Sequence, residues 1–336
     1  MQYKLNIQSL LPGDIILVGY NDRRSRMIQN RTNSQFSHAM LYWYGSIIHA
    51  SDIVITENPS RQLFEEDEQV CVLRLKEDRW NWFAIREIIM KARSMVGTYY
   101  DTEALKAMAK GEDVVPNPNR QMCSKFVAQC YDYVCIDIVD DYELCTPEDI
   151  HKSNLLEEMP NPLLVATDED IAFAKSKDVT EVQFATILNF LNALNKQFPN
   201  EDIVSLDQLE DFLEHDPSNG DCVLDLLKQT DYFDLWRIEK EYCPYNYDVD
   251  AFKQMWKGNS ATMAIAVKKE SERIIEEKRE EIKVYEQRIE TIGDIEYYRE
   301  MIALRNNIIA ASMERIEVAE QVLKDFGVVK ILFPWC

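Results

Sequence analysis

Three residues of this sequence combine reactive side chains with positions suited to nucleophilic chemistry: Cys123, His38 and His49. Cys123 follows a loop with prolines and asparagines and opens a segment, 123–134, whose apolar residues recur at helical spacing. A cysteine at the start of a helix lies at the positive end of the helix dipole, beside N–H groups that lack partners. Both effects lower the pKa of its thiol, so this position predicts a reactive thiolate.

The two histidines lie on consecutive expected strands, 37–44 and 46–49. His38, at the head of the first strand, can take the thiol proton of Cys123 and later deliver it to a leaving group. His49 can hydrogen-bond the far ring nitrogen of His38 and hold its tautomer. Together they predict a thiolate–imidazolium pair with a third, orienting residue, although residue types alone would allow many other pairings.

Five short motifs occur in a fixed order along the first 155 residues: Leu11-Pro-Gly-Asp-Ile-Ile, Phe36-Ser-His-Ala, Ile48-His-Ala, Met122-Cys-Ser-Lys-Phe-Val-Ala-Gln and Cys145-Thr-Pro-Glu-Asp-Ile. This order resembles the motif set of the circularly permuted NlpC-type, YiiX-like cysteine hydrolases. The resemblance implies a papain-like fold in which the histidine strand precedes the nucleophile helix. It also implies that Cys123 is the nucleophile, His38 the general base and acid, and His49 the orienting residue.

One residue differs from the pattern that the resemblance implies. Many permuted members have a carboxylate or an amide where His49 stands, whereas a Cys-His-His set is more typical of non-permuted NlpC peptidases. The identity of the third residue therefore stays open.

The sequence predicts an α+β fold for the first half of the chain. A turn and strand are expected within 10–19, further strands at 52–56 and 70–75, and helices at 80–96 and 101–109. Asp14, in a Pro-Gly-Asp turn, is expected to hydrogen-bond the turn backbone. We expect a permuted papain-like domain over residues 8–158.

The second half has only helical periodicity. After an expected linker, 159–174, amphipathic segments cover 180–197 and 205–214, and two long charged helices meet at Gly293-Asp294. These patterns predict an all-helical accessory domain, 175–336, that ends in a long antiparallel helical hairpin. The apolar tail 328–336 is expected to dock on a core.

Composition limits the classes of function. The 336 residues suffice for two domains, and a formal net charge of −22 argues against nucleic acid or an anionic membrane surface as a partner. No apolar window is long enough to span a membrane, and the start of the chain does not resemble a secretion signal. The eight cysteines are scattered, so we expect a reduced, cytoplasmic protein.

No close Cys/His cluster suggests zinc, and we expect neither a metal nor an organic cofactor. His151 and His215 lie in acidic helical surroundings and are expected to be solvated.

The resulting hypothesis is an amidase or peptidase that transfers an acyl group through a Cys123 thioester, acting on a small acyl, peptide or lipid-derived substrate. Two alternatives stay open: a lipid acyltransferase or phospholipase on the same fold, and a binding or scaffold protein with a degenerate site. The helical hairpin could bind a protein partner or a second copy.

Overall fold

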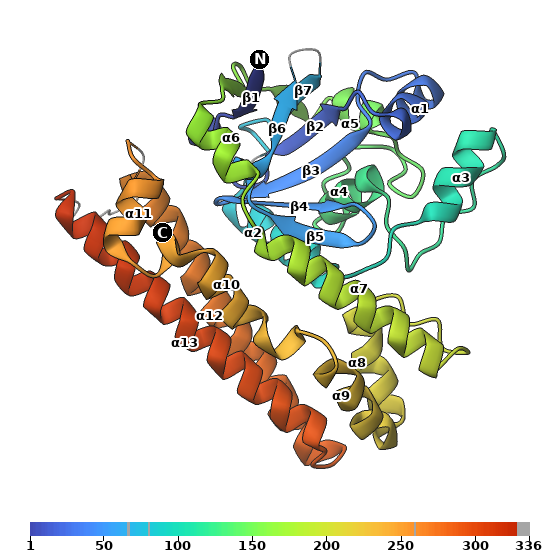
Figure 1. Cartoon of the computed structure of the whole chain (residues 1–336). Helices are drawn as coiled ribbons and strands as arrows, with labels where there is room; N and C mark the ends of the chain where they lie inside the picture. Colours follow the sequence, from blue (N-terminus) through green and yellow to red (C-terminus); the bar gives the residue numbers. More distant parts are fainter. Residues whose placement is uncertain (66–67, 80, 259, 328–336) are drawn as a thin grey trace. The chain divides into compact units, whose positions relative to one another are not determined.

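The computed structural model describes residues 1–65, 68–79, 81–258 and 260–327. The chain divides into two compact units, the first comprising Met1–Ser176 with Asp202–Gln208, and the second Lys177–Glu201 with Leu209–Cys336 (Figure 1). The short segment 202–208 thus belongs with the first unit although its neighbours in sequence belong to the second. The tail 328–336, for which docking is expected, lies outside the described residues.

A six-stranded antiparallel sheet, with the order β5-β4-β3-β2-β7-β8, forms the centre of the first unit. Its strands are β2 (Ile15–Gly19), β3 (His38–Trp43), β4 (Ser46–Ala50), β5 (Val54–Glu57), β7 (Gln69–Leu75) and β8 (Leu156–Glu158). All but β8 overlap a predicted strand. β8 has only three residues, which is too short for an alternating pattern to show in the sequence.

Helices cover one face of this sheet. The helix α2 (Trp82–Ser94) contributes Ile88, and α4 (Cys123–Asp132) contributes Phe126, to a core that also contains Ile15 and Leu41 from the sheet. These four side chains are fully buried. The remaining helices of this unit are α1 (Arg23–Thr32), α3 (Thr102–Lys110), α5 (Pro147–His151) and α6 (Asp168–Ala174). The predicted α+β class is confirmed.

A three-stranded sheet covers the opposite face. Its strands are β1 (Gln2–Leu5), β6 (Leu63–Glu65) and β9 (Leu163–Val165), in the order β6-β1-β9. Leu5 and Phe64 pack there against Ile16, Met40 and Val72 of the larger sheet. The segment 159–174, expected as a linker, thus supplies the strand β9 and the helix α6, because β9 pairs with β1 at the start of the chain.

The turn before β2 contains a buried ion pair. Asp14 accepts a hydrogen bond from the backbone N–H of Leu11 at 2.8 Å, which confirms its predicted role in the turn. Both of its carboxylate oxygens also accept hydrogen bonds from Arg74, at 2.8 and 2.7 Å. Burial raises the pKa of Asp14, and the hydrogen bonds from Arg74 oppose that shift. A carboxylate that is 1% exposed therefore depends on this guanidinium.

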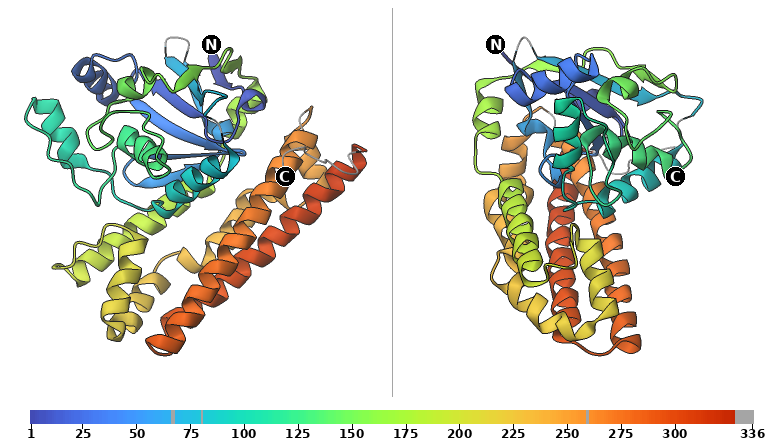
Figure 2. Two further views of the ribbon diagram at one scale, coloured as in Figure 1. Left: turned by 180° about the vertical axis from the view of Figure 1, so that it is seen from behind. Right: turned by 90° about the vertical axis from the view of Figure 1, so that its right-hand side faces the viewer.

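Helices and turns make up the described part of the second unit. The helices are α7 (Val179–Gln197), α8 (Leu206–His215), α9 (Gly220–Lys228), α10 (Leu235–Tyr242), α11 (Val249–Met255), α12 (Ser260–Thr291) and α13 (Glu296–Asp325). The last two pack side by side along their length as an antiparallel pair (Figure 2), so the predicted hairpin is confirmed. Among the described residues, no helix has both the length and the apolarity that crossing a bilayer requires.

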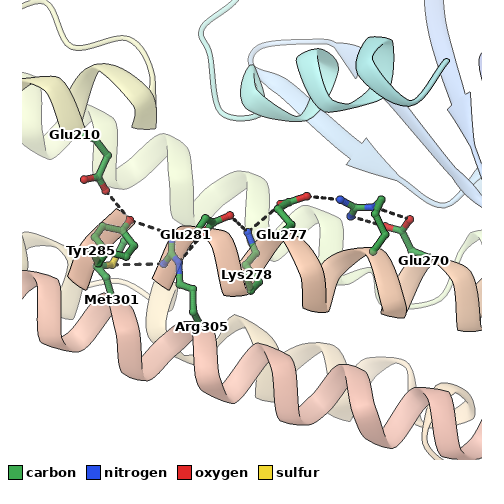
Figure 3. Close-up of polar contacts among 9 residues, drawn as sticks. Glu210, Glu270, Glu277, Lys278, Glu281, Tyr285, Met301 and Arg305 are labelled. Carbon is green, nitrogen blue, oxygen red and sulfur yellow. Dashed lines mark hydrogen bonds and ion pairs between the residues drawn. The ribbon is translucent and has the colours of Figure 1, made fainter. Parts of the chain in front are cut away.

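Charged side chains are partly buried in this hairpin. Arg305 of α13 donates to Glu281 of α12 at 2.8 Å, and its guanidinium also contacts the hydroxyl of Tyr285 (Figure 3). Tyr285 in turn donates to Glu210 of α8 at 2.8 Å. A buried guanidinium that loses its partner is strongly destabilising, so these contacts favour one register of the two long helices over others.

The Asp14–Arg74 pair generates a prediction about stability. Arg74→Met should lower the free energy of unfolding by about 3–5 kcal/mol, because it leaves a buried carboxylate unpaired. This loss of stability should become smaller as the pH falls, because protonated Asp14 is uncharged and needs no cation beside it. Urea unfolding at pH 7 and pH 4 measures both effects.

As the control, Arg79→Met removes an exposed arginine that pairs with Asp78 and should cost at most about 1 kcal/mol. Equal losses in the two variants would contradict the assigned role of Arg74.

Candidate active site

Cys123 is the first residue of α4, as the sequence predicts. Met122 occupies the position before the helix and makes no side-chain capping bond to its first turn. The sulfur of Cys123 lies 3.8 Å from the carbonyl oxygen of Ser37 and accepts hydrogen bonds from the N–H groups of Ala39 and Ser124. The structure therefore brings the thiol against the backbone of β3 on both sides of His38.

His38 and His49 are in direct contact. The Nε2 atom of His38 lies 2.9 Å from Nδ1 of His49, and Nε2 of His49 lies 3.1 Å from Oε2 of Glu57. The three residues come from the neighbouring strands β3, β4 and β5. The amide of Gln62 donates to the same oxygen of Glu57 at 2.8 Å and holds the carboxylate in place. Glu57 was not predicted from the sequence, because it is the last residue of a short strand and belongs to no motif.

These contacts determine which ring nitrogens carry protons. A carboxylate only accepts hydrogen bonds, so Nε2 of His49 must donate to Glu57. In a neutral imidazole the other nitrogen is an acceptor, so Nδ1 of His49 accepts from Nε2 of His38. Neutral His38 is then left with an unprotonated Nδ1 atom. This is the tautomer that a general base requires.

Burial controls the ionisation of the thiol and of its expected base. It raises the pKa of Cys123, although the N–H groups of Ala39 and Ser124 and the charge of Arg24 oppose the shift. Burial, followed by the charges of His49 and Arg24, holds the pKa of His38 well below its usual value. Both shifts favour neutral groups. Burial thus pushes both groups toward their neutral forms and opposes the effect expected of the helix dipole, so the thiolate–imidazolium pair stays a prediction.

Two further side chains lie at the thiol. Tyr100, which is 5% exposed, forms a side-chain hydrogen bond with Cys123. Arg24, in the first turn of α1, lies over the ring of Tyr100 with its guanidinium carbon 5.0 Å from the ring centroid. The guanidinium of Arg24 therefore lies near the buried thiol. The sequence offers no way to distinguish Arg24 from the other arginines of the segment 23–31.

A second group of cysteine, histidine and carboxylate lies elsewhere in the first unit. The ligand atoms of Cys71, His151 and Glu158 all lie within 4.8 Å of one another. His151 is thus half-buried rather than solvated as expected, because α5 packs it beside β7. Burial, followed by the charge of Glu158, raises the pKa of Cys71 to about 12. This thiol is less suited to nucleophilic attack than Cys123, which lies at a helix start and receives hydrogen bonds from N–H groups.

A profile described as "Permuted papain-like amidase enzyme, YaeF/YiiX, C92 family" matches residues 9–183, more than half of the chain. The chain belongs to this family. Membership confirms the predicted permuted papain-like fold for the first part of the chain, and the family is one of hydrolases.

Among solved structures, the metalloprotein YiiX from Escherichia coli O157:H7 aligns with 15% sequence identity and a TM-score of 0.36. The alignment covers 45% of this chain and 97% of that protein. A search of curated proteins found no match. The family match therefore covers the unit that contains Cys123, His38 and His49 and ends shortly after the start of α7.

The chain of hydrogen bonds from Glu57 to His38 generates a prediction. Glu57→Leu should slow alkylation of Cys123 at pH 7.5 by about tenfold or more, because His49 and then His38 can adopt the wrong tautomer. Glu57→Gln keeps an oxygen acceptor and should retain much more of the rate. Mass spectrometry of the modified cysteine over time measures both rates. Equal rates in Glu57→Leu and the wild type would remove Glu57 from the site.

Proposed function

We propose that this protein is a cysteine amidase or peptidase that acts through a thioester on Cys123, with His38 as general base and acid. One observation carries the proposal: the contacts of Glu57 and His49 leave His38 in the neutral tautomer with Nδ1 unprotonated, while the Cys123 thiol lies against the backbone next to His38. Family membership supports an amidase-type hydrolase.

Acylation begins from neutral groups. The thiol proton of Cys123 passes to Nδ1 of His38 as the sulfur attacks the carbonyl carbon of an amide. The imidazolium that forms is stabilised by His49 and Glu57, since Nε2 of His38 keeps its donor contact. The negative charge on the carbonyl oxygen is held by N–H groups in the first turn of α4, where Met122 provides no side-chain cap.

The second half of the reaction returns the site to its starting state. Protonated His38 gives its proton to the leaving amine, and the C–N bond breaks to leave the acyl group on Cys123. Water, deprotonated by His38, then attacks the thioester, and the thiol recovers its proton. Arg24 lies beside Tyr100 at the thiol and 4.0 Å from Asp52, so an anionic group of the substrate would compete with Asp52 for its guanidinium.

The proposal extends to a small acyl, peptide or lipid-derived substrate and to catalysis without a cofactor. It also extends to a cytoplasmic location and to association through the α12–α13 hairpin. A lipid acyltransferase and a degenerate scaffold are both distinguishable from an amidase by the experiment below.

The nucleophile is tested by trapping the acyl-enzyme. We expect activated acyl amides to add one acyl group to Cys123, and Cys123→Ala to abolish the adduct, with mass spectrometry locating it. The matched control, Cys71→Ser, should leave the adduct unchanged. An acyl group on Cys71 would instead identify Cys71 as the nucleophile, with His151 and Glu158 beside it. Acylation by long-chain esters but not by amides would favour the lipid enzyme, and no adduct with any reagent would favour the scaffold.

The low pKa of His38 predicts the shape of the pH profile. The base must be neutral, so the acylation rate should fall only as the pH drops below about 6.5. Burial and His49 contribute most to this low pKa, and Arg24 adds to it. Arg24→Met should therefore raise the pKa of His38 and move the acid limb to higher pH.

The neighbouring variant Arg23→Met is the control for this experiment, because Arg23 is exposed as Arg24 is but does not contribute to the shift in the pKa of His38. Its acid limb should coincide with that of the wild type. A profile that moves equally in the two variants would mean that general surface charge, rather than the position of Arg24, sets the ionisation of His38.

A further inference from the structure

Three different elements of the first unit bring one thiol, one imidazole and one carboxylate together. Cys71 lies in β7, His151 ends α5 and Glu158 ends β8, and their ligand atoms lie within 4.8 Å of one another. We propose that these three residues form a Zn²⁺ site that is separate from the Cys123 site. The sequence gives no indication of it, since Cys71 lies 80 residues before His151 and 87 before Glu158.

The set of donor atoms favours zinc over other common ions. Zn²⁺ binds thiolate sulfur, imidazole nitrogen and carboxylate oxygen, usually in a tetrahedron, whereas Mg²⁺ and Ca²⁺ prefer oxygen ligands alone. Neither of those ions would select a site whose most buried ligand is a sulfur atom. Copper and iron would compete for the same donors, so direct binding measurements must compare metals.

The burial of the three side chains suits closure around an ion. Zinc bonds of about 2.0–2.3 Å place neighbouring tetrahedral ligand atoms roughly 3.3–3.6 Å apart, so ligand atoms separated by as much as 4.8 Å would have to approach by about 1.2–1.5 Å. Cys71 is 3% exposed and belongs to the core under the helices. His151 is half-buried and Glu158 is exposed. The two outer side chains can therefore rotate toward a sulfur atom whose position is already fixed.

The described residues supply three ligands, which leaves the fourth tetrahedral position for water. Because each ligand comes from a different element, a bound ion would tie the edge strand β8 and the helix α5 to β7. His151 also packs edge-to-face against Phe36, with ring centroids 5.0 Å apart. This ring contact already orients the imidazole before any ion binds.

Binding is tested on the full-length protein with Zn²⁺ and Co²⁺. We expect one equivalent of Zn²⁺ to compete with a chromophoric chelator, and Co²⁺ to produce a thiolate-to-cobalt charge-transfer band. Cys71→Ser should abolish that band. Glu158→Gln should weaken Zn²⁺ affinity by at least about tenfold, since even residues outside the ligand shell contribute that much. The wild type should also unfold at a higher temperature with Zn²⁺ than without it.

Two control variants keep the proposal falsifiable. Cys123→Ser should bind Zn²⁺ as the wild type does, and so should Glu157→Gln, the neighbour of Glu158 on β8. If the charge-transfer band persists in Cys71→Ser and disappears in Cys123→Ser, the ion belongs to the other cysteine and the proposal is wrong. Absence of stoichiometric binding in the wild type, or equal affinity in Glu158→Gln and the wild type, would also overturn it.

Discussion

The candidate site depends on the contact between the first turn of α4 and the backbone of β3. This contact places the thiol of Cys123 beside Ser37 and Ala39, the two neighbours of His38. It exists because the apolar face of α4, with Phe126 at its centre, is buried against the sheet. The burial that anchors the helix also desolvates the thiol. Packing therefore determines both where the thiol lies and why its pKa is raised.

The pairing of three adjacent strands keeps the hydrogen-bonded side chains of His38, His49 and Glu57 in contact. His38, His49 and Glu57 lie on β3, β4 and β5, and a strand that slipped by one residue would turn its side chain to the other face of the sheet. The chain of hydrogen bonds continues through Gln62 to the hydroxyl of Tyr20, which donates to the amide oxygen at 3.1 Å. A slip in register would thus break the hydrogen bonds that join His38, His49 and Glu57.

The sequence predicted the parts of this structure that local patterns encode. The start of α4 at Cys123 and the strand of His38 follow from turn residues and periodicity, and the ordered motifs link the two. Glu57 was missed because one carboxylate on a short strand shows no pattern. The pair of Cys71 and His151 was missed because only folding brings together positions 80 residues apart. The burial that raises the pKa of the Cys123 thiol could not be predicted either, since burial is a tertiary property.

The uncapped start of α4 has a consequence for attempts to stabilise this protein. A serine or aspartate in place of Met122 would commonly strengthen a helix start by about 1 kcal/mol. Its side-chain oxygen would, however, accept from the N–H groups of Ser124 or Lys125, and the mechanism proposed above needs N–H groups of this turn as donors to the carbonyl oxygen. Selection for thermal tolerance alone would favour such a substitution, and selection for turnover would remove it. Position 122 is therefore where these two pressures oppose each other most directly.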